Sequence, residues 1–172
     1  MNDDEIYFKY SPNIREIDVL EAGDGICNCC EKPVSIYYPT MYCEEEIKCL
    51  CLSCIASGAA VAKFDGDFIQ DVELDKVSDP EKHKELFERT PGYVSWQGEY
   101  WLACCDDFCA YLGDVGTAEL EEMGIAVEVI ADYEARDEYA DIRGYLVKAG
   151  SMAGYLFRCL HCQKRHLWVD AD

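Results

Sequence analysis

Cysteine has the clearest chemical potential in this sequence of 172 residues, because it occurs twelve times. Four pairs have a spacing that suits metal binding: Cys27/Cys30, Cys51/Cys54, Cys159/Cys162 and Cys105/Cys109. In the C-x-x-C pairs, a tight turn can direct both sulfurs to one point about 2.3 Å from a zinc ion. Since thiols stay reduced inside cells, repeated pairs of this kind predict structural zinc rather than disulfides.

The first predicted zinc site combines the two pairs that lie nearest to each other in the sequence. Cys27 and Cys30 are followed after twenty residues by Cys51 and Cys54, a spacing close to that of known four-cysteine zinc sites. Neighbouring thiols leave alternatives open, because any one of three could replace a member of this set: Cys29, Cys43 or Cys49.

The second predicted zinc site joins Cys105 and Cys109 to Cys159 and Cys162, two pairs that only the fold can bring together. The C-x-x-x-C spacing would place both thiols of the first pair on one face of a helix. The alternatives are that Cys105 and Cys109 are small core residues and the last pair holds no metal. Three further side chains could also replace a ligand: Cys104, His161 or His166. A thioredoxin-like redox site is disfavoured, since it needs one such motif at a helix N-terminus.

The elements that must position these thiols are short. In the first half, the sequence predicts a strand at Ser35 to Tyr42, a helix from Cys51 to Phe64, and a short helix that ends near Arg89, with its N-terminal cap in the string Ser78-Asp79-Pro80-Glu81. In the second half, it predicts helix-like periodicity from Val94 to Leu112, a helix at Thr117 to Met123, a strand at Ile125 to Ile130, a helix from Glu134 to Lys148, and a strand, knuckle and strand from Gly154 to Asp170. These elements predict an α+β fold.

We expect one compact domain over residues 1–172, with possible lobes at 1–90 and 91–172. Zinc-knuckle or zinc-ribbon-like elements would brace small β-hairpins and several short helices. Half of the residues are hydrophobic, which is enough for a core at this length.

The charge balance limits the classes of partner. There are 35 acidic residues against 15 basic ones, a net charge of −20. Such a surface repels phosphate backbones and anionic lipids, so we expect neither nucleic acid nor a membrane as partner, and a basic protein as its complement. The polar N-terminal stretch lacks the pattern of a secretory signal, and no apolar run is long enough to span a membrane, so we expect the cytoplasm.

Catalysis is not expected. A cysteine nucleophile needs a histidine base, and the three histidines, His83, His161 and His166, lie in a charged helix or beside the last knuckle. A four-thiolate zinc site is closed, whereas catalytic zinc keeps an open position. No phosphate-binding glycine loop is present.

The strongest acidic run lies between Asp114 and Asp141, with ten acidic residues and the single basic Arg136. Its interleaved aromatic and acidic side chains form a candidate partner-binding surface: Tyr133, Glu134, Asp137, Glu138, Tyr139 and Asp141. The alternative is a solvated helix face that contributes only solubility.

Ordered motifs along most of the chain resemble the CbrC family, a bacterial family named for tolerance of a DNase-type colicin. The resemblance rests on Cys27-Asn28-Cys29-Cys30, Leu50-Cys51 to Cys54-Ile55-Ala56 with Lys63-Phe64-Asp65-Gly66, Arg89-Thr90-Pro91-Gly92 with Trp96-Gln97, and Phe157-Arg158-Cys159-Leu160-His161-Cys162. It implies a small cysteine-rich protein without an assigned reaction, and an immunity or tolerance protein that neutralises a basic, nuclease-type toxin.

Two other functions remain open from the sequence. One is a zinc-stabilised adaptor or stress protein with a different protein partner, and the other is a metal-dependent hydrolase. The identity of the partner and the oligomeric state are not indicated by the sequence.

Overall fold

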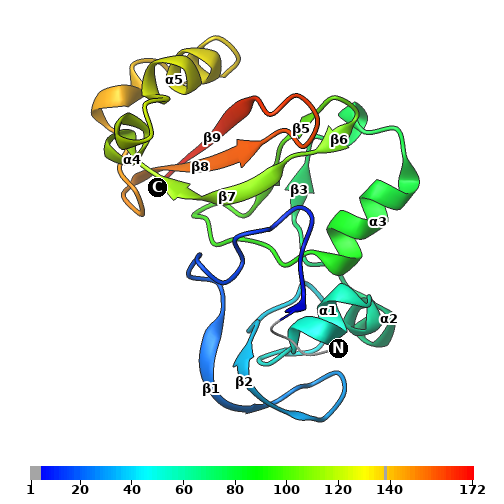
Figure 1. Ribbon diagram of the computed structural model, residues 1–172. Coiled ribbons are helices and arrows are strands. Elements are labelled where there is room, and N and C mark those ends of the chain that lie inside the picture. Colours follow the sequence, from blue (N-terminus) through cyan, green and yellow to red (C-terminus); the bar gives the residue numbers. More distant parts are fainter. Residues whose placement is uncertain (1–4, 138) are drawn as a thin grey trace.

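The computed structural model describes residues 5–137 and 139–172, and its elements confirm the expected α+β class (Figure 1). The strands are β1 (Glu21–Ile26), β2 (Pro33–Tyr37), β3 (Asp71–Val72), β4 (Tyr100–Trp101), β5 (Ala103–Cys104), β6 (Asp107–Phe108), β7 (Ala110–Val115), β8 (Met152–Arg158) and β9 (Arg165–Ala171). The helices are α1 (Leu52–Ala56), α2 (Ala59–Phe64), α3 (Pro80–Arg89), α4 (Thr117–Glu122) and α5 (Ala126–Glu134), with short 3-10 turns η2 (Leu74–Lys76) and η3 (Ile142–Gly144).

The largest sheet is the antiparallel array β7-β8-β9. Its last two strands form the predicted strand, knuckle and strand, with Arg158 paired to Arg165 across the turn. Alternation along β8 sends side chains to both faces: Tyr155 and Phe157 lie in one hydrophobic core and Leu156 in the other. The sheet therefore separates two cores.

The smaller core lies under α4 and α5, which cover one face of the sheet (Figure 1). Ala126, Val129, Ile130 and Tyr133 follow the i, i+3, i+4, i+7 spacing of one helical face, and all four are buried. The strand expected at Ile125 to Ile130 is therefore wrong, because the helical period outweighs the β propensity of valine and isoleucine there.

The larger core joins the N-terminal part of the chain to the opposite face of the sheet. Tyr93 is its centre, since this buried ring contacts the rings of Trp101, Tyr111, Tyr155 and Phe157. The helices α1, α2 and α3 lie beside one another, and the β1–β2 hairpin extends away from the sheet (Figure 1).

Two expected helices differ from the structure because of single residues with left-handed backbone. Gly58, with φ of 74°, divides the helix expected from Cys51 to Phe64 into α1 and α2. Asp141, with φ of 56°, lies within the helix expected from Glu134 to Lys148, and the described residues of that range contain only the last residue of α5 and the short turn η3. The helix expected to end near Arg89 is confirmed as α3, and the structure shows that Asp79 caps it, since the Asp79 carboxylate accepts the Glu81 N–H at 2.9 Å.

The helix-like periodicity from Val94 to Leu112 is wrong. This stretch forms three two-residue strands and the beginning of β7. Cys105 and Asp106, both with φ of 57°, make the tight turn between β5 and β6. Consecutive left-handed residues suit a hairpin turn and cannot continue a right-handed helix.

Candidate metal centres

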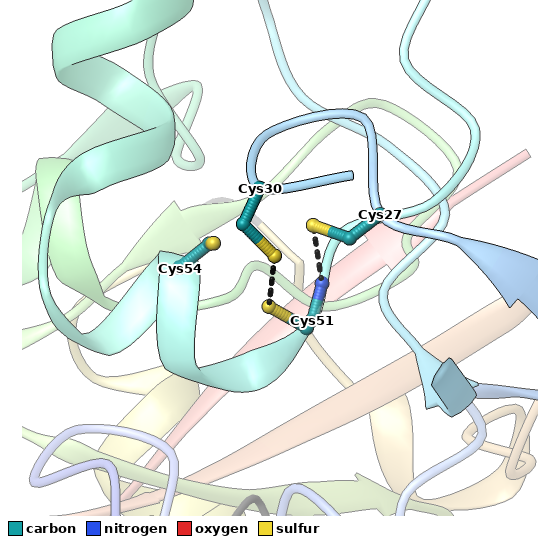
Figure 2. Close-up of side chains that lie close together, drawn as sticks. All are labelled: Cys27, Cys30, Cys51 and Cys54. Carbon is teal, nitrogen blue, oxygen red and sulfur yellow. Dashed lines mark hydrogen bonds between the residues drawn. The ribbon is translucent and has the colours of Figure 1, made fainter. Parts of the chain in front are cut away.

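The first cluster of thiols forms where the β1–β2 hairpin meets the start of α1. Cys27 and Cys30 lie in the turn that follows β1, while Cys51 is the N-cap residue of α1 and Cys54 lies on its first turn. Figure 2 shows the four side chains converging from these two segments. Their sulfurs all lie within 4.8 Å of one another, so the four thiols could hold one metal ion.

The spacing of these sulfurs fits a tetrahedral site. With metal–sulfur bonds of about 2.3 Å, the sulfurs of a tetrahedral zinc site are about 3.8 Å apart. The Sγ atoms of Cys30 and Cys51 are 3.8 Å apart. The predicted first set of four cysteines is thus brought together with a separation that suits zinc coordination.

Backbone N–H groups prepare one of these sulfurs for ionisation. Burial raises the pKa of the Cys27 thiol, but backbone N–H groups of Cys51, Cys30 and Cys29 outweigh it and lower the pKa to about 7. The Cys51 N–H donates to Cys27 Sγ at 3.3 Å. In contrast, burial and the neighbouring thiols raise the pKa of Cys54. Four thiolates at this spacing repel one another, so a cation is needed to hold all four in ionised form.

The second cluster forms between two hairpin turns that are far apart in the sequence. Cys104 and Cys105 lie at the β5–β6 turn, and Cys159 and Cys162 lie in the turn between β8 and β9. These four sulfurs also lie within 4.8 Å of one another. Cys104 Sγ is 3.7 Å from Cys105 Sγ and 3.8 Å from Cys162 Sγ, which again suits a tetrahedral four-thiolate site.

The two C-x-x-C turns share one backbone conformation. In each turn the N–H of the first cysteine donates to a lysine carbonyl five residues later at 2.9 Å, Cys27 to Lys32 and Cys159 to Lys164. The residue after the second cysteine is left-handed in both, with φ of 60° at Glu31 and 62° at Gln163. This repeated geometry indicates that both turns are built to present two sulfurs to one point.

The second turn also directs N–H groups at its first sulfur. Burial raises the pKa of the Cys159 thiol, but the backbone N–H groups of Cys162 and His161 outweigh it and lower the pKa to about 7. Both N–H groups donate to Cys159 Sγ at 3.4 Å. Burial and the neighbouring thiols raise the pKa of Cys104.

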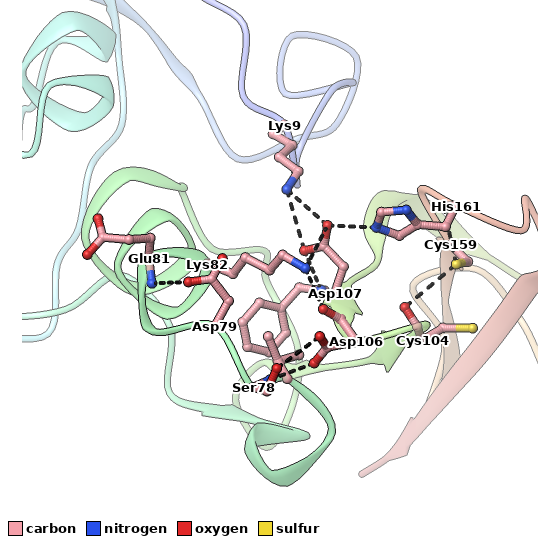
Figure 3. Close-up of polar contacts among 12 residues, drawn as sticks. Lys9, Ser78, Asp79, Glu81, Lys82, Cys104, Asp106, Asp107, Cys159 and His161 are labelled. Atoms are coloured by element: carbon pink, nitrogen blue, oxygen red, sulfur yellow. Dashed lines mark hydrogen bonds and ion pairs between the residues drawn. The ribbon is translucent and has the colours of Figure 1, made fainter.

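A buried carboxylate beside the second cluster ties it to the N-terminal segment (Figure 3). Asp107 is 2% exposed, and its oxygens accept hydrogen bonds from Tyr10 Oη at 2.7 Å and from Lys9 Nζ at 3.0 Å. His161 Nε2 lies 3.0 Å from the same carboxylate. His161, a possible ligand from the sequence, is thus engaged with Asp107 and does not belong to the cluster of four thiols.

The expected ligand Cys109 is corrected to Cys104. Cys109 is fully buried in the larger core, and its carbonyl accepts the indole N–H of Trp101 at 2.9 Å. The helical argument fails because the segment is a hairpin, in which Cys105 is at the turn and Cys109 follows β6. A usable signal was Asp106-Asp107 directly after two adjacent cysteines, since acidic residues favour turns.

The other spare side chains have separate positions. Cys43 is half-buried, and its thiol donates to the Glu45 carbonyl at 3.2 Å. Burial and the thiols of Cys27 and Cys30 raise the pKa of Cys49, and Cys29 contributes to the raised pKa of Cys54, but neither Cys29 nor Cys49 is among the four of the first cluster. His166 lies beside α5, with Nδ1 3.5 Å from Asp132 Oδ2.

The candidate partner-binding residues do not form one exposed face. Tyr133 is 1% exposed and belongs to the smaller core, so it is no exposed anchor, because the helical face it shares packs on the sheet. Glu134 accepts the Ile142 N–H at 2.9 Å, and half-buried Asp137 is paired with Arg136. Tyr139 and Asp141 are exposed, and Glu138 lies outside the described residues.

None of the described helices is long and apolar enough to cross a membrane. No solved structure shows significant similarity to the chain.

Comparisons with known proteins correct the family suggested by the sequence motifs. The model of an uncharacterised protein family, UPF0167, matches residues 6–171. A UPF0167 protein of Pseudomonas aeruginosa is 37% identical over 99% of both chains. UPF0167 proteins of Mycobacterium bovis and Mycobacterium tuberculosis are each 34% identical over 95% of this chain and 91% of their own.

None of these matches carries the CbrC name, so the assignment to the CbrC family is wrong. Short cysteine motifs recur in unrelated proteins because zinc geometry selects them, whereas the family match extends over nearly the whole chain. The chain belongs to the uncharacterised protein family UPF0167.

Proposed function

We propose that this protein is a non-catalytic, zinc-stabilised binding protein whose partner is a basic protein, and that the partner is a nuclease-type bacterial toxin. In this proposal the thiols hold the fold together and the carboxylates recognise the partner. The toxin would be neutralised when its basic surface is covered.

The two thiol clusters support the first half of the proposal. Soft thiolate ligands in tetrahedral geometry favour zinc, and a site with four protein ligands has no open position for substrate. In each cluster the four sulfurs lie within 4.8 Å of one another, and three of the sulfur pairs are 3.7 to 3.8 Å apart. A zinc ion in the first cluster would join the β1–β2 hairpin to α1, and one in the second cluster would join the β5–β6 turn to the β8–β9 turn.

The charge of the molecule carries the second half. The chain has a formal net charge of −20, and zinc bound by four thiolates would add about −2 at each site. Nucleases bind a phosphate backbone through basic surfaces, so a strongly acidic protein can compete for the same contacts. With the family corrected, this charge complementarity is the observation on which the toxin class rests.

The test measures binding and inhibition together. Zinc-loaded protein is titrated by calorimetry with purified basic nuclease-toxin domains encoded by the same organism, and their DNA cleavage is assayed in parallel. We expect a saturable complex that weakens as NaCl rises and that blocks cleavage at one equivalent. Saturable binding without inhibition would leave a binding protein and remove the toxin role. No binding to any basic domain would overturn the proposal.

A matched pair of variants separates local recognition from net charge. One variant combines three changes, Glu134→Gln, Asp137→Asn and Asp141→Asn. The control changes three exposed loop residues, Glu44, Glu45 and Glu46, to Gln, so the change in charge is equal. We expect the first variant to weaken binding about tenfold or more and the control to weaken it about twofold. If both variants lost the same amount of binding affinity, only net charge would matter, and Glu134, Asp137 and Asp141 would be removed from the proposal.

A further inference from the structure

A cavity of about 580 Å³ lies where the edge strand β9, the end of α5 and the segment before β4 meet. Its lining includes four carboxylates: Asp71, Glu99, Asp137 and Asp170. Among the described residues that line it, none is lysine or arginine. The cavity therefore combines concave shape with an anionic wall, two properties that favour a cationic ligand.

One of these carboxylates is buried beside the segment that precedes β4. Asp170 is 4% exposed, and its Oδ2 accepts the backbone N–H of Gln97 at 2.8 Å. A carboxylate has two oxygens that can each accept more than one hydrogen bond, so a ligand that brings N–H groups into the cavity could also bond to Asp170.

A second wall of the cavity is aromatic. Tyr100 and Trp168 are stacked, with ring centroids 4.3 Å apart and planes inclined by 29°. Tyr133 and Tyr139 also line the cavity, from the end of α5 and the segment after it. Flat aromatic faces next to carboxylates favour a planar cation, because the guanidinium group of arginine can stack on a ring and donate paired hydrogen bonds.

The outer edge of β9, which faces away from β8, lies beside the cavity. The Leu167 carbonyl accepts from Arg136 Nη2 at 3.2 Å, and the Ala171 carbonyl accepts from Gln97 Nε2 at 2.8 Å. Both carbonyls therefore face away from β8. Val169 lies between them on the same strand and lines the cavity, and alternation turns its backbone groups to the same side. An extended segment that enters here would lie beside Val169, because the Leu167 and Ala171 carbonyls already accept from Arg136 and Gln97.

We propose that this cavity binds an arginine side chain presented by an extended segment of a basic protein, with the guanidinium group between the Trp168–Tyr100 stack and Asp170. This inference rests on the proposed function, since it names the site and the recognition chemistry for the basic partner. Lysine fits less well, because a compact ammonium cannot stack or donate in a planar fork.

The test uses full-length, zinc-loaded protein and three acetylated hexapeptides that differ only at two positions, which are arginine, lysine or citrulline. Binding is followed by two-dimensional NMR, in which the Trp168 indole signal reports on the cavity. We expect the arginine peptide to bind in a saturable manner and shift this signal. The lysine peptide should bind about threefold to tenfold more weakly, and the neutral citrulline peptide should show no saturable binding.

Asp170→Asn tests the buried carboxylate, because asparagine can keep the bond from Gln97 while losing the charge. We expect about tenfold weaker binding of the arginine peptide, with Glu45→Gln as the matched control that stays within about twofold. Asp137→Asn is a second variant at a half-buried position, in case Asp170→Asn alters the fold. Equal binding by the citrulline peptide, or equal losses in the control, would overturn the inference. The inference would also be overturned if calcium chloride shifted the Trp168 signal and the arginine peptide did not.

The outcomes also separate this inference from the proposed function. If basic nuclease domains bind Asp170→Asn as tightly as the unaltered chain, the proposed function stands and the cavity is not its site. If the arginine peptide binds the cavity but no basic domain binds the protein, the inference about the cavity stands and the proposed partner class is wrong. If neither peptide nor protein binds, both fail.

Discussion

At the scale of single residues, position relative to a turn decides the role of each cysteine. Cys104 and Cys109 are both cysteines of one short segment, yet only Cys104 has its sulfur near the other three thiols of the second cluster. Cys109 is fully buried among apolar side chains. Two adjacent cysteines at a hairpin tip can both face one metal, because the left-handed turn redirects the chain between them and the following strand.

Cys104→Ser should remove about one equivalent of zinc from the purified protein, while Cys109→Ala should keep the full content. The reason is that Cys104 belongs to the cluster and Cys109 only fills the core, where loss of the thiol should cost about 1 kcal/mol of stability. Metal content is measured by atomic emission after gel filtration in reducing buffer. If Cys109→Ala lost zinc and Cys104→Ser kept it, Cys109 and not Cys104 would be the ligand.

Glu99 provides a prediction about pH. Burial raises the pKa of this carboxyl above its usual range, against the lowering effect of the hydrogen bond from Tyr42. The folded state therefore takes up this proton at higher pH than the unfolded state, so stability from this group is lost as pH rises from the unfolded pKa through the folded pKa.

Glu99→Gln should remove that dependence. We expect the variant to gain stability relative to the unaltered chain near pH 7.5, and the difference to shrink as the pH falls toward 5. Urea denaturation at a series of pH values measures it, and comparison of the two proteins cancels the other 34 acidic residues. A difference that stays constant across this range would contradict the assignment of a raised pKa.

At the scale of elements, two similar knuckle turns position four of the eight thiols in the two clusters. Glu31 and Gln163 occupy left-handed backbone, which costs a residue with a Cβ atom about 1 kcal/mol. Lys63 adds support in the first turn, since its ammonium donates to the carbonyls of Asn28 and Cys29, both at 2.8 Å. Backbone hydrogen bonds therefore hold the shape of both turns, and the Lys63 ammonium adds support in the first turn.

Glu31→Gly should stabilise the zinc-loaded protein by up to about 1 kcal/mol, because glycine adopts positive φ without strain. Part of the gain is offset by the greater freedom of glycine in the unfolded chain. Chemical denaturation with zinc present measures the change. Glu44→Gly is the control, since Glu44 is exposed and is not among the residues with positive φ, and it should be neutral or destabilising.

At the scale of the whole molecule, like charge is the dominant long-range force. The chain carries 35 acidic residues and only 15 basic ones, and described ion pairs such as Lys164–Asp132 and Arg143–Glu121 neutralise a minority of the acidic residues. Self-repulsion of this kind favours expansion of the chain and is reduced by salt. Two hydrophobic cores on opposite faces of one sheet oppose it.

The melting temperature should therefore rise by several degrees between about 20 mM and 300 mM NaCl, over the range in which the Debye length shortens from about 20 Å to about 6 Å. Differential scanning calorimetry at pH 7.5 measures it, and sucrose at equal osmolality serves as the control for nonionic effects. A melting temperature that falls with NaCl would mean that attractive ion pairs outweigh the net repulsion.

The sequence alone determined the features that depend on local spacing. The C-x-x-C turns, the capped helix at Pro80–Arg89 and the last β-hairpin follow from short-range geometry, and the net charge needs no fold at all. The i, i+3, i+4, i+7 pattern of Ala126–Glu134 is also local and matches the helix, although valine and isoleucine in this segment favour a strand.

Only the tertiary structure decided which thiols meet in the second cluster and which carboxylates surround a cavity. Cys104 and Cys162 are 58 positions apart, and Asp71 and Asp170 belong to different strands, so no local rule relates them. Residues with left-handed backbone in short turns, such as Cys105 and Asp141, change the direction of the chain without a recognisable pattern in the sequence. Packing across the sheet then selects one arrangement, because burial of apolar surface is cooperative and extends over the whole chain.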